Sequence, residues 1–319
     1  MMLKKTLVVL VIFASALVAL YVDNFKLHSW ASPPPIGSYK TDTLTVDTLK
    51  RRFNYYLPEN LKPNAKLVFV FHGSHSSAAT IREQTAYQFD YLANDNNFIA
   101  VYPSGFEGSW NDCRASANYS ANTNNINDPA FITAMIEYFD KQHKINLDQI
   151  FALGLSNGGQ FVYRLAYEMP TRFAGFAAIA ANPPSADNFD CIASGKPVSM
   201  AILNGTQDPL NPYNGGLVDV YGDTSRGHVI SSIDNGDYWR TLANLDQFSE
   251  TILTKETENR VIKAHWASAQ AAQQVALFTF NNSGHVIPSS KVKFQRIRGP
   301  NPAELEASEL IWQFFSQLK

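Results

Sequence analysis

The chain has 319 residues, of which 45% are hydrophobic and 17% are charged. This composition excludes intrinsic disorder, a collagen-like repeat and a disulfide-rich miniprotein, and the length allows a large buried core. With 26 basic and 28 acidic residues the net charge is −2, and this balance argues against a nucleic-acid partner, which would need a basic face.

The N-terminal segment predicts export from the cytoplasm. Two lysines precede an apolar run from Leu7 to Tyr21, which is the pattern of a secretory signal. Signal cleavage would follow either Ala16 or Ala31. The alternative is an uncleaved membrane anchor, because about 17 apolar residues is the lower limit for crossing a bilayer. We therefore expect residues 1–31 to be a signal peptide or N-terminal anchor, and residues 32–319 to form a single periplasmic or extracellular domain.

Short apolar segments recur along the rest of the chain and predict β-strands. Several are continuous apolar runs, as expected for strands that are buried on both faces of a sheet. The predicted strands are Thr43–Val46, Arg52–Leu57, Leu67–Phe71, Phe98–Tyr102, Ile150–Leu153, Ala174–Ala180, Val198–Leu203 and Val275–Phe280, with a further strand-like stretch at Val261–Trp266.

Helical patterns lie between these strands. Apolar residues recur at helical spacing over residues 131–139 and 161–169, and a last helix is predicted from Pro302 onward. Strands that alternate with helices indicate an α/β fold, in which a mostly parallel sheet of about eight strands is covered by helices on both faces. Ligands bind at the carboxyl ends of the strands in such sheets, so functional residues are expected in the loops that follow strands.

The two cysteines, Cys113 and Cys191, each follow a predicted strand at the same end of the sheet. In an oxidising compartment this placement favours a disulfide between them, and the alternative is two separate buried thiols. The disulfide would hold the loop that carries Trp110 beside the functional end of the sheet.

The segment from Gly154 to Gly158 contains the pattern G-x-S-x-G, with Ser156 at its centre. A predicted strand precedes the pattern and a predicted helix follows it, as in the sharp turn that exposes a nucleophilic serine above a sheet. Glycines are needed because the turn leaves no room for side chains at these positions. We therefore predict Ser156 as a nucleophile; the alternative is an ordinary glycine-rich turn.

A serine nucleophile needs a general base, and in this type of fold the base follows the serine and the acid in the chain. His285 lies in the loop after the predicted strand Val275–Phe280 and before the last helix, which is the place that the mechanism requires. Of the other histidines after the serine, His265 lies within a strand-like stretch and His228 lies in a polar loop that no strand precedes. His285 is therefore the predicted base.

The base needs a carboxylate to orient its ring. Asp208 lies in the turn after the predicted strand Val198–Leu203, which is the expected place. Its rivals are Asp219 and Asp223, further into the same loop, and Asp190, one strand earlier. Asp208 is the predicted acid.

A developing oxyanion needs two hydrogen-bond donors. The backbone amide of Asn157 is the first candidate, and the second lies at Gly73 and Ser74, in the loop after a predicted strand. A metal site built from His72 and His75 is the competing interpretation. No acidic or cysteine partner stands at a suitable spacing, so no metal is expected.

Trp110 and Tyr213 also follow predicted strands, and we expect them to bind substrate; the alternative is that they pack the loops. The chain contains neither a G-x-G-x-x-G nor a P-loop pattern, so no nucleotide cofactor is expected.

With these residues in place, the chain resembles the polyhydroxybutyrate depolymerase-like esterases, α/β-hydrolases related to bacterial feruloyl and acetyl xylan esterases. The resemblance extends from about residue 43 to the last helix. It rests on the segments Phe71–Gly73, Tyr102–Gly105, Ser109–Asp112, Gly154–Gly159, Tyr163–Ala166, Met169–Pro170, Arg172–Ala174, Asp208–Pro209 and Pro212–Gly216.

The resemblance implies an α/β-hydrolase catalytic domain over residues 32–319, which hydrolyses carboxylic esters with a Ser/Asp/His triad and no cofactor, usually outside the cytoplasm. The implied substrates are short-chain acyl, hydroxyalkanoate or plant-polysaccharide (acetyl, feruloyl) esters, small or polymeric. The sequence departs from the family at Asn204, where the family more often has His, and at Val286, where it commonly has Trp after the catalytic His. The second departure changes a wall of the pocket.

A serine peptidase or lipase of the same fold is the first alternative, since a triad does not distinguish leaving groups. A non-catalytic binding module is a second, and the complete serine, acid and base in chain order argue against it. Contact with a membrane is expected only through the N-terminal segment, if it is not cleaved.

Overall fold

The computed structural model describes residues 26–302 and 304–318. Most of the predicted signal or anchor segment therefore lies outside the described residues. Within the described ranges, no helix is both long enough and apolar enough to cross a membrane.

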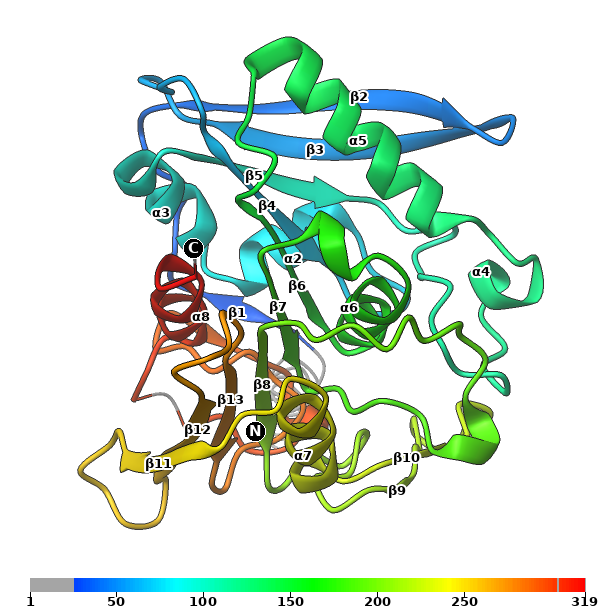
Figure 1. The fold of residues 1–319 in the computed structure, drawn as a ribbon, viewed down its shortest axis with the longest axis vertical. Coiled ribbons are helices and arrows are strands. Elements are labelled where there is room, and N and C mark those ends of the chain that lie inside the picture. The colour runs from blue at the N-terminus through cyan, green and yellow to red at the C-terminus, as the bar shows by residue number, and fades with distance from the viewer. Residues whose placement is uncertain (1–25, 303, 319) are drawn as a thin grey trace, which may run out of the picture.

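A ten-stranded sheet forms the centre of the protein (Figure 1). Its six middle strands are parallel, and antiparallel pairs extend it at both edges. The strands are ordered β11 (Gln247–Ile252), β12 (Val261–Ala267), β13 (Val275–Phe280), β8 (Met200–Gly205), β7 (Gly175–Ile179), β6 (Ile150–Leu155), β4 (Lys66–Phe71), β5 (Phe98–Pro103), β3 (Leu49–Leu57) and β2 (Ser38–Val46).

The predicted α/β class is confirmed, and the sheet is larger than the eight or so strands expected. Strand β11 is missing from the predicted strands. All of its side chains are exposed, so its sequence has no apolar face and no alternation of apolar and polar residues that would indicate a strand. It pairs only with β12 at the edge of the sheet.

Helices cover both faces of the sheet because its buried strands carry apolar side chains on both sides. In β4, Leu67 and Phe69 pack with the helices of one face, and Val68 and Val70 with those of the other. Figure 1 shows α3 and α8 on one side of the central strands and α6 and α7 on the other. One core includes residues of α5 (Asp128–His143), α6 (Asn157–Glu168) and α7 (Ser232–Leu242), and the other includes residues of α2 (Ala78–Gln84), α3 (Gln88–Asn96) and α8 (Ala307–Ser316).

Helix α8 begins at Ala307, later than the predicted start at Pro302. The side chain of Glu306 accepts hydrogen bonds from the Ser289 hydroxyl at 2.6 Å and from the Ser290 backbone N–H at 2.8 Å. These bonds tie the residue before the helix to a neighbouring loop, so the helix starts only after it.

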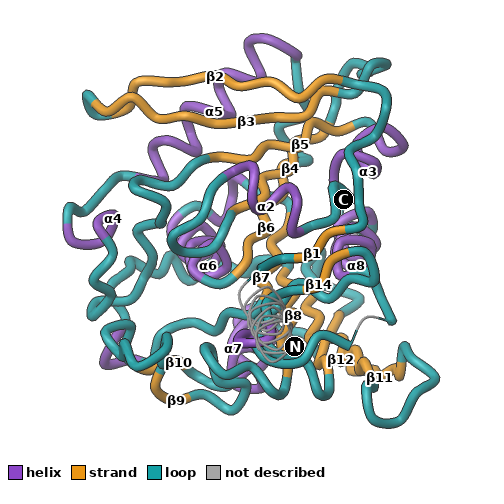
Figure 2. The backbone as a smooth tube through the Cα atoms, turned by 180° about the vertical axis from the view of Figure 1, so that it is seen from behind, coloured by secondary structure: helices purple, strands orange, loops and turns teal. Residues whose placement is uncertain are grey.

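Among the described residues, two short antiparallel strand pairs lie outside the main sheet. Strand β9 (Gly216–Leu217) pairs with β10 (His228–Val229), and β1 (His28–Ser29) pairs with β14 (Val292–Lys293), as Figure 2 shows. The described residues also include the short α-helix α4 (Ser120–Thr123) and 3-10 turns at Pro170–Arg172, Ala186–Asn188 and Arg296–Arg298. Strand β1 lies inside the segment expected to be removed, so signal cleavage after Ala31 would delete it.

The predicted disulfide is present. Cys113 and Cys191 are bonded, with their Cα atoms 5.0 Å apart and 78 positions apart in the sequence. It joins the loop after β5 to the loop after β7, and the backbone N–H of Asp190 also donates to the Cys113 carbonyl at 2.9 Å. The loops that follow two separate strands are therefore held together at one end of the sheet.

Candidate active site

Ser156 occupies a strained turn between β6 and α6. Its backbone has φ 55° and ψ −121°, a region that side-chain-bearing residues rarely adopt. Two backbone hydrogen bonds hold this conformation: the Ser156 N–H donates to the Ile179 carbonyl at 2.9 Å, and its carbonyl accepts from the Gln160 N–H at 2.8 Å. The hydroxyl is thus raised above the carboxyl end of the sheet, at the N-terminus of a helix.

The two glycines of the motif are required by close backbone contacts. A Cβ atom at Gly154 would lie 2.4 Å from the carbonyl carbon of Gly158, and a Cβ at Gly158 would lie 2.5 Å from the carbonyl oxygen of His72. Both distances are far inside van der Waals contact, so the turn forms only with glycine at these positions.

Asp208 and His285 are brought together by the loops after β8 and β13. His285 Nδ1 donates to Asp208 Oδ2 at 2.7 Å, and both side chains are almost fully buried. The other carboxylate oxygen of Asp208 accepts from the backbone N–H groups of Leu210 and Asn211, each at 2.8 Å. This arrangement leaves Nε2 of His285 free to take a proton from a neighbouring hydroxyl.

Backbone hydrogen bonds fix the loop that carries His285. The His285 N–H donates to the Arg298 carbonyl at 2.6 Å, and the Gly284 N–H donates to the Pro300 carbonyl at 2.7 Å. The segment before α8 therefore holds the backbone of the loop from which the imidazole projects.

Gly73 lies directly against the serine. A Cβ atom at Gly73 would be 3.4 Å from Ser156 Cβ and 3.9 Å from its Oγ. Gly73 and Ser74 line the same cavity as Ser156, as expected of a loop that supplies an oxyanion donor.

The buried ring of His72 holds this loop in place. Its Nδ1 donates to the Gly73 carbonyl at 2.7 Å, and its Nε2 accepts from the Gly105 N–H at 2.9 Å. Burial lowers the pKa of His72 to about 4, so the ring is neutral at ordinary pH. A hydrogen-bonded Gly73 carbonyl sets the plane of the following peptide, whose N–H belongs to Ser74 and points the opposite way.

The side chain of Asn157 is held inside the protein while its backbone N–H begins α6. Its amide Nδ2 donates to Asp112 Oδ2 at 2.7 Å and to the Trp110 carbonyl at 3.0 Å. The first backbone N–H groups of a helix have no partner within the helix, so this amide is available as an oxyanion donor.

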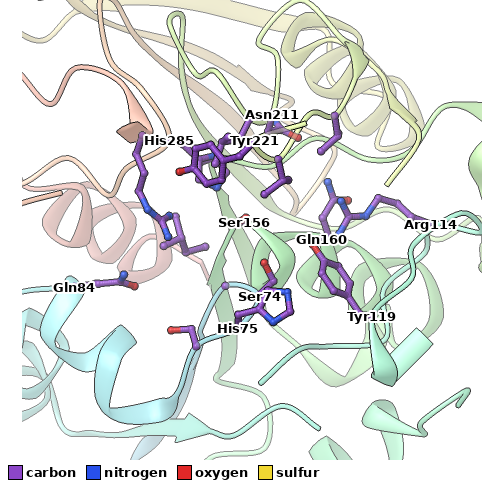
Figure 3. A pocket seen from close by; sticks show the side chains of 18 residues that line it. Ser74, His75, Gln84, Arg114, Tyr119, Ser156, Gln160, Asn211, Tyr221 and His285 are labelled. Carbon is purple, nitrogen blue, oxygen red and sulfur yellow. The ribbon is translucent and has the colours of Figure 1, made fainter. Parts of the chain in front are cut away.

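A cavity of about 300 Å³ opens above the serine. In Figure 3, Ser156 lies at its centre, with His285 and Tyr221 on one side and Ser74 and His75 on the opposite side. The predicted nucleophile, base and oxyanion loop therefore share one space, with Asp208 behind the base.

Neither residue predicted to bind substrate lines this cavity. Trp110 is fully buried: its ring stacks on Phe161 at 5.1 Å, and its Nε1 donates to the His72 carbonyl at 2.9 Å. The Tyr213 hydroxyl pairs with Thr279 at 2.7 Å, and the residue lies away from the cavity wall. Both side chains support loops, because their polar tips are already bonded to neighbouring segments.

Sequence reasoning missed most of the cavity wall. Gln160 lies one helical turn after Ser156, so the helical period could have revealed it. No pattern marks the others, which come from separate loops. The missed polar and aromatic lining residues are Ser76, Gln84, Arg114, Tyr119, Gln160, Asn211, Tyr221 and Arg298.

The residues present do not form a metal site. Both ring nitrogens of His72 are engaged with the backbone, and His75 lines the cavity separately. Within residues 26–302 and 304–318, no group of three or more potential ligands is close enough to hold a metal ion.

The chain has the α/β-hydrolase fold. Among solved structures, an acetyl xylan esterase from Aspergillus awamori superposes with a TM-score of 0.57 at 15% identity, over 87% of this chain and 99% of that one. No family model matches the sequence.

The chain is also similar in sequence to several curated esterases and a depolymerase. The chain is 23% identical to poly(3-hydroxyalkanoate) depolymerase C of Paucimonas lemoignei over 73% of its length, and 25% identical to feruloyl esterase C of Emericella nidulans over 59%. It is also 26% identical, over 51% of its length, to a bifunctional acetylxylan esterase/xylanase of Neocallimastix patriciarum. The matches span 58%, 66% and 22% of these relatives, less than two thirds of each. The resemblance to the polyhydroxybutyrate depolymerase-like esterases is confirmed by these relatives.

Proposed function

We propose that this chain hydrolyses carboxylic esters through a covalent acyl-enzyme formed on Ser156. The observation that carries the proposal is the shared cavity: Ser156, on its strained turn, opens into the same space as His285, whose ring is held by Asp208. Nucleophile, base and orienting carboxylate are the minimum set for acyl transfer by a serine.

In the proposed reaction, His285 Nε2 takes the hydroxyl proton as Ser156 Oγ attacks the ester carbonyl carbon. Asp208 keeps the ring in the tautomer with the proton on Nδ1 and stabilises the imidazolium that forms. The same proton then passes to the leaving alcohol as the ester C–O bond breaks. Water, activated by His285, cleaves the acyl-enzyme and releases the carboxylic acid.

The developing negative charge on the carbonyl oxygen is stabilised by backbone donors. The proposed donors are the backbone N–H of Asn157, which follows the serine at the start of α6, and those of the Gly73–Ser74 loop, which lies against the serine. Removal of one such donor costs about 10²–10³ in rate in other serine hydrolases.

The proposed substrates are short-chain acyl, hydroxyalkanoate, acetyl or feruloyl esters. The relatives named above include a depolymerase of poly(3-hydroxyalkanoate), a feruloyl esterase and an acetylxylan esterase. A cavity of about 300 Å³ is at the small end of ligand sites and supports a compact acyl group.

The test is hydrolysis by the purified full-length chain of nitrophenyl esters of graded acyl length, acetylated xylan, a methyl ferulate and a hydroxybutyrate oligomer. Ser156→Ala should lower the rate on the best substrate by on the order of 10⁴–10⁶. Ser249→Ala, on the exposed edge strand β11, is the matched control and should match the parent.

A folded parent that cleaves none of these esters, and whose serine is not labelled by a fluorophosphonate, would contradict the proposal and favour a binding module. Cleavage of peptides or long-chain triglycerides in preference to these esters would favour the peptidase or lipase alternative.

We further propose that the protein is exported. The basic and apolar N-terminal sequence and the disulfide support this location, because disulfides persist in oxidising compartments. Of the two cleavage positions, the one after Ala16 keeps β1 paired with β14. We therefore propose cleavage after Ala16. Mass spectrometry of the mature N-terminus tests both points: a start at residue 17 or 32 supports export, and a start at residue 32 contradicts cleavage after Ala16.

A further inference from the structure

Two arginines, Arg114 and Arg298, line the cavity above Ser156. None of its 18 lining residues is an aspartate or glutamate.

Arg114 is already neutralised. Its guanidinium forms a buried ion pair with Asp112, with Nη2 2.5 Å from Oδ2 and Nε 3.1 Å from Oδ1. Asp112 also accepts the hydrogen bond from Asn157 at 2.7 Å. This arginine therefore belongs to the support of the active-site turn.

Arg298 has no such partner. Within the described parts of the chain, its half-buried guanidinium makes no hydrogen bond or ion pair. The Asp208 carboxylate interacts with this guanidinium electrostatically, but both of its oxygens already accept hydrogen bonds: Oδ2 from His285, and Oδ1 from the backbone N–H groups of Leu210 and Asn211. A guanidinium stays protonated in proteins, so Arg298, although the Asp208 carboxylate is close enough to interact with its charge, lines the cavity with unused N–H donors.

The position of Arg298 points to the alcohol half of an ester. The Arg298 carbonyl accepts the hydrogen bond from the backbone N–H of His285 at 2.6 Å, so the backbones of the two residues lie next to each other. His285 must deliver its proton to the leaving alcohol, and the alcohol half therefore lies on the His285 side of the cavity.

We propose that Arg298 binds a carboxylate carried by the alcohol half of the substrate, so that the preferred substrates are O-acyl esters of hydroxy acids. This inference rests on the proposed esterase function. The planar guanidinium matches a carboxylate with two parallel N–H···O bonds, which are stronger than hydrogen bonds between neutral groups.

The carboxylate takes no part in bond exchange. Ser156 Oγ bonds to the acyl carbon, the ester C–O bond breaks, and the His285 proton goes to the departing hydroxy acid. Water then hydrolyses the acyl-enzyme, and the hydroxy acid leaves with its carboxylate still ionised.

The test uses a matched pair of esters, 3-(butanoyloxy)propanoate and its neutral amide, 3-(butanoyloxy)propanamide, with release of butanoate as the readout. The parent should prefer the carboxylate by about 10- to 100-fold in kcat/KM, mainly through a lower KM, as expected for a charged hydrogen bond. Arg298→Met should abolish the preference by raising KM for the carboxylate alone, and Arg298→Lys should retain part of it.

Arg240→Met is the control for loss of one positive charge. Arg240 is partly exposed on α7, outside the cavity, and pairs only with Asp237 among the described residues, so its variant should keep the parent's preference. Product inhibition of the parent tests the proposal without any variant. We expect 3-hydroxypropanoate, and not 3-hydroxypropanamide, to inhibit hydrolysis of the neutral ester competitively.

Equal rates for the two esters in the parent would overturn the carboxylate proposal while leaving the esterase proposal intact. An equal loss of both rates in Arg298→Met would also overturn it, because Arg298 would then act on Asp208 and His285 rather than on substrate. Failure of the parent on every ester, simple nitrophenyl esters included, would instead be a failure of the proposed function.

Discussion

The buried side chain of Asn157 forms a reciprocal pair of hydrogen bonds with the backbone of Trp110. Its Oδ1 accepts from the Trp110 N–H at 2.8 Å, and its Nδ2 donates to the Trp110 carbonyl at 3.0 Å. The residue that begins α6 is thereby joined to the loop after β5. The indole Nε1 of Trp110 in turn donates to the His72 carbonyl. Trp110 therefore connects α6 with the loop that carries Gly73 and Ser74, the two parts of the proposed oxyanion site.

Asn157→Ala should lower both stability and turnover. The substitution leaves two buried backbone groups of Trp110 without partners, which should reduce the free energy of unfolding by on the order of 2–4 kcal/mol. Movement of the turn should lower kcat by about 10- to 100-fold, with a smaller effect on KM. Urea unfolding and steady-state kinetics measure both effects. Asn124→Ala, at an exposed site of local hydrogen bonding, is the control, and equal behaviour of the two variants would contradict the prediction.

Asp208→Asn should stop turnover without unfolding the protein. The asparagine amide would donate to His285 Nδ1 and force the proton onto Nε2, so the ring could no longer take the proton of Ser156. In comparable triads this change costs on the order of 10⁴ in kcat. Asp219→Asn is the matched control, since Asp219 lies further along the same loop and, in the described part of the chain, its side chain accepts a single hydrogen bond, from the Gly222 N–H to Oδ1. Comparable losses in both variants would argue against Asp208 as the acid.

His72 should make the protein less stable in mild acid. Burial lowers the pKa of its ring from 6.5 to about 4 in the folded state. Between these values the unfolded chain binds a proton that the folded protein does not, so stability falls as pH decreases from 6.5 towards 4 and then levels off. Over this pH range the free energy of unfolding should fall by on the order of 3 kcal/mol because of His72. Urea unfolding at several pH values should show a flatter dependence in His72→Asn than in the parent; parallel curves would contradict this.

The disulfide should contribute substantially to stability. A loop closed over 78 positions restricts the unfolded chain by about 4–5 kcal/mol in the chain-entropy account. The double variant Cys113→Ser, Cys191→Ser should unfold at a correspondingly lower denaturant concentration, and reductant should destabilise the parent but not this variant. Thiol titration of the unfolded, unreduced parent should find no free thiol. Two free thiols would refute the bond.

Much of the fold could be predicted because its signals are local. The buried central strands are continuous apolar runs, and α5 and α6 have apolar residues at helical spacing. The exposed edge strand β11 could not be predicted, because its position depends on pairing with β12 and not on any buried face. The start of α8 could not either, since hydrogen bonds from Ser289 and Ser290, distant in the chain, set it.

The candidate site divides in the same way. Ser156 could be predicted from the glycines around it, because their close backbone contacts leave a mark in a short motif. The positions of Trp110 and Tyr213 after strands predict that both bind substrate, but such a position says where a loop begins and not where a side chain points. The structure turns both into the loops, where their polar tips are bonded.

By itself, the sequence determined the α/β class, the turn at Ser156 and the chain order of serine, acid and base. These follow from periodicity, from glycine spacing and from the rule that loops after parallel strands meet at one edge. Only the tertiary structure decided which side chains form the cavity and that the Arg298 guanidinium, near His285, makes no hydrogen bond or ion pair among the described residues. The physical reason is that the lining residues come from segments as far apart as Gly73, Tyr119 and Arg298, so packing, and not any local pattern, brings them together.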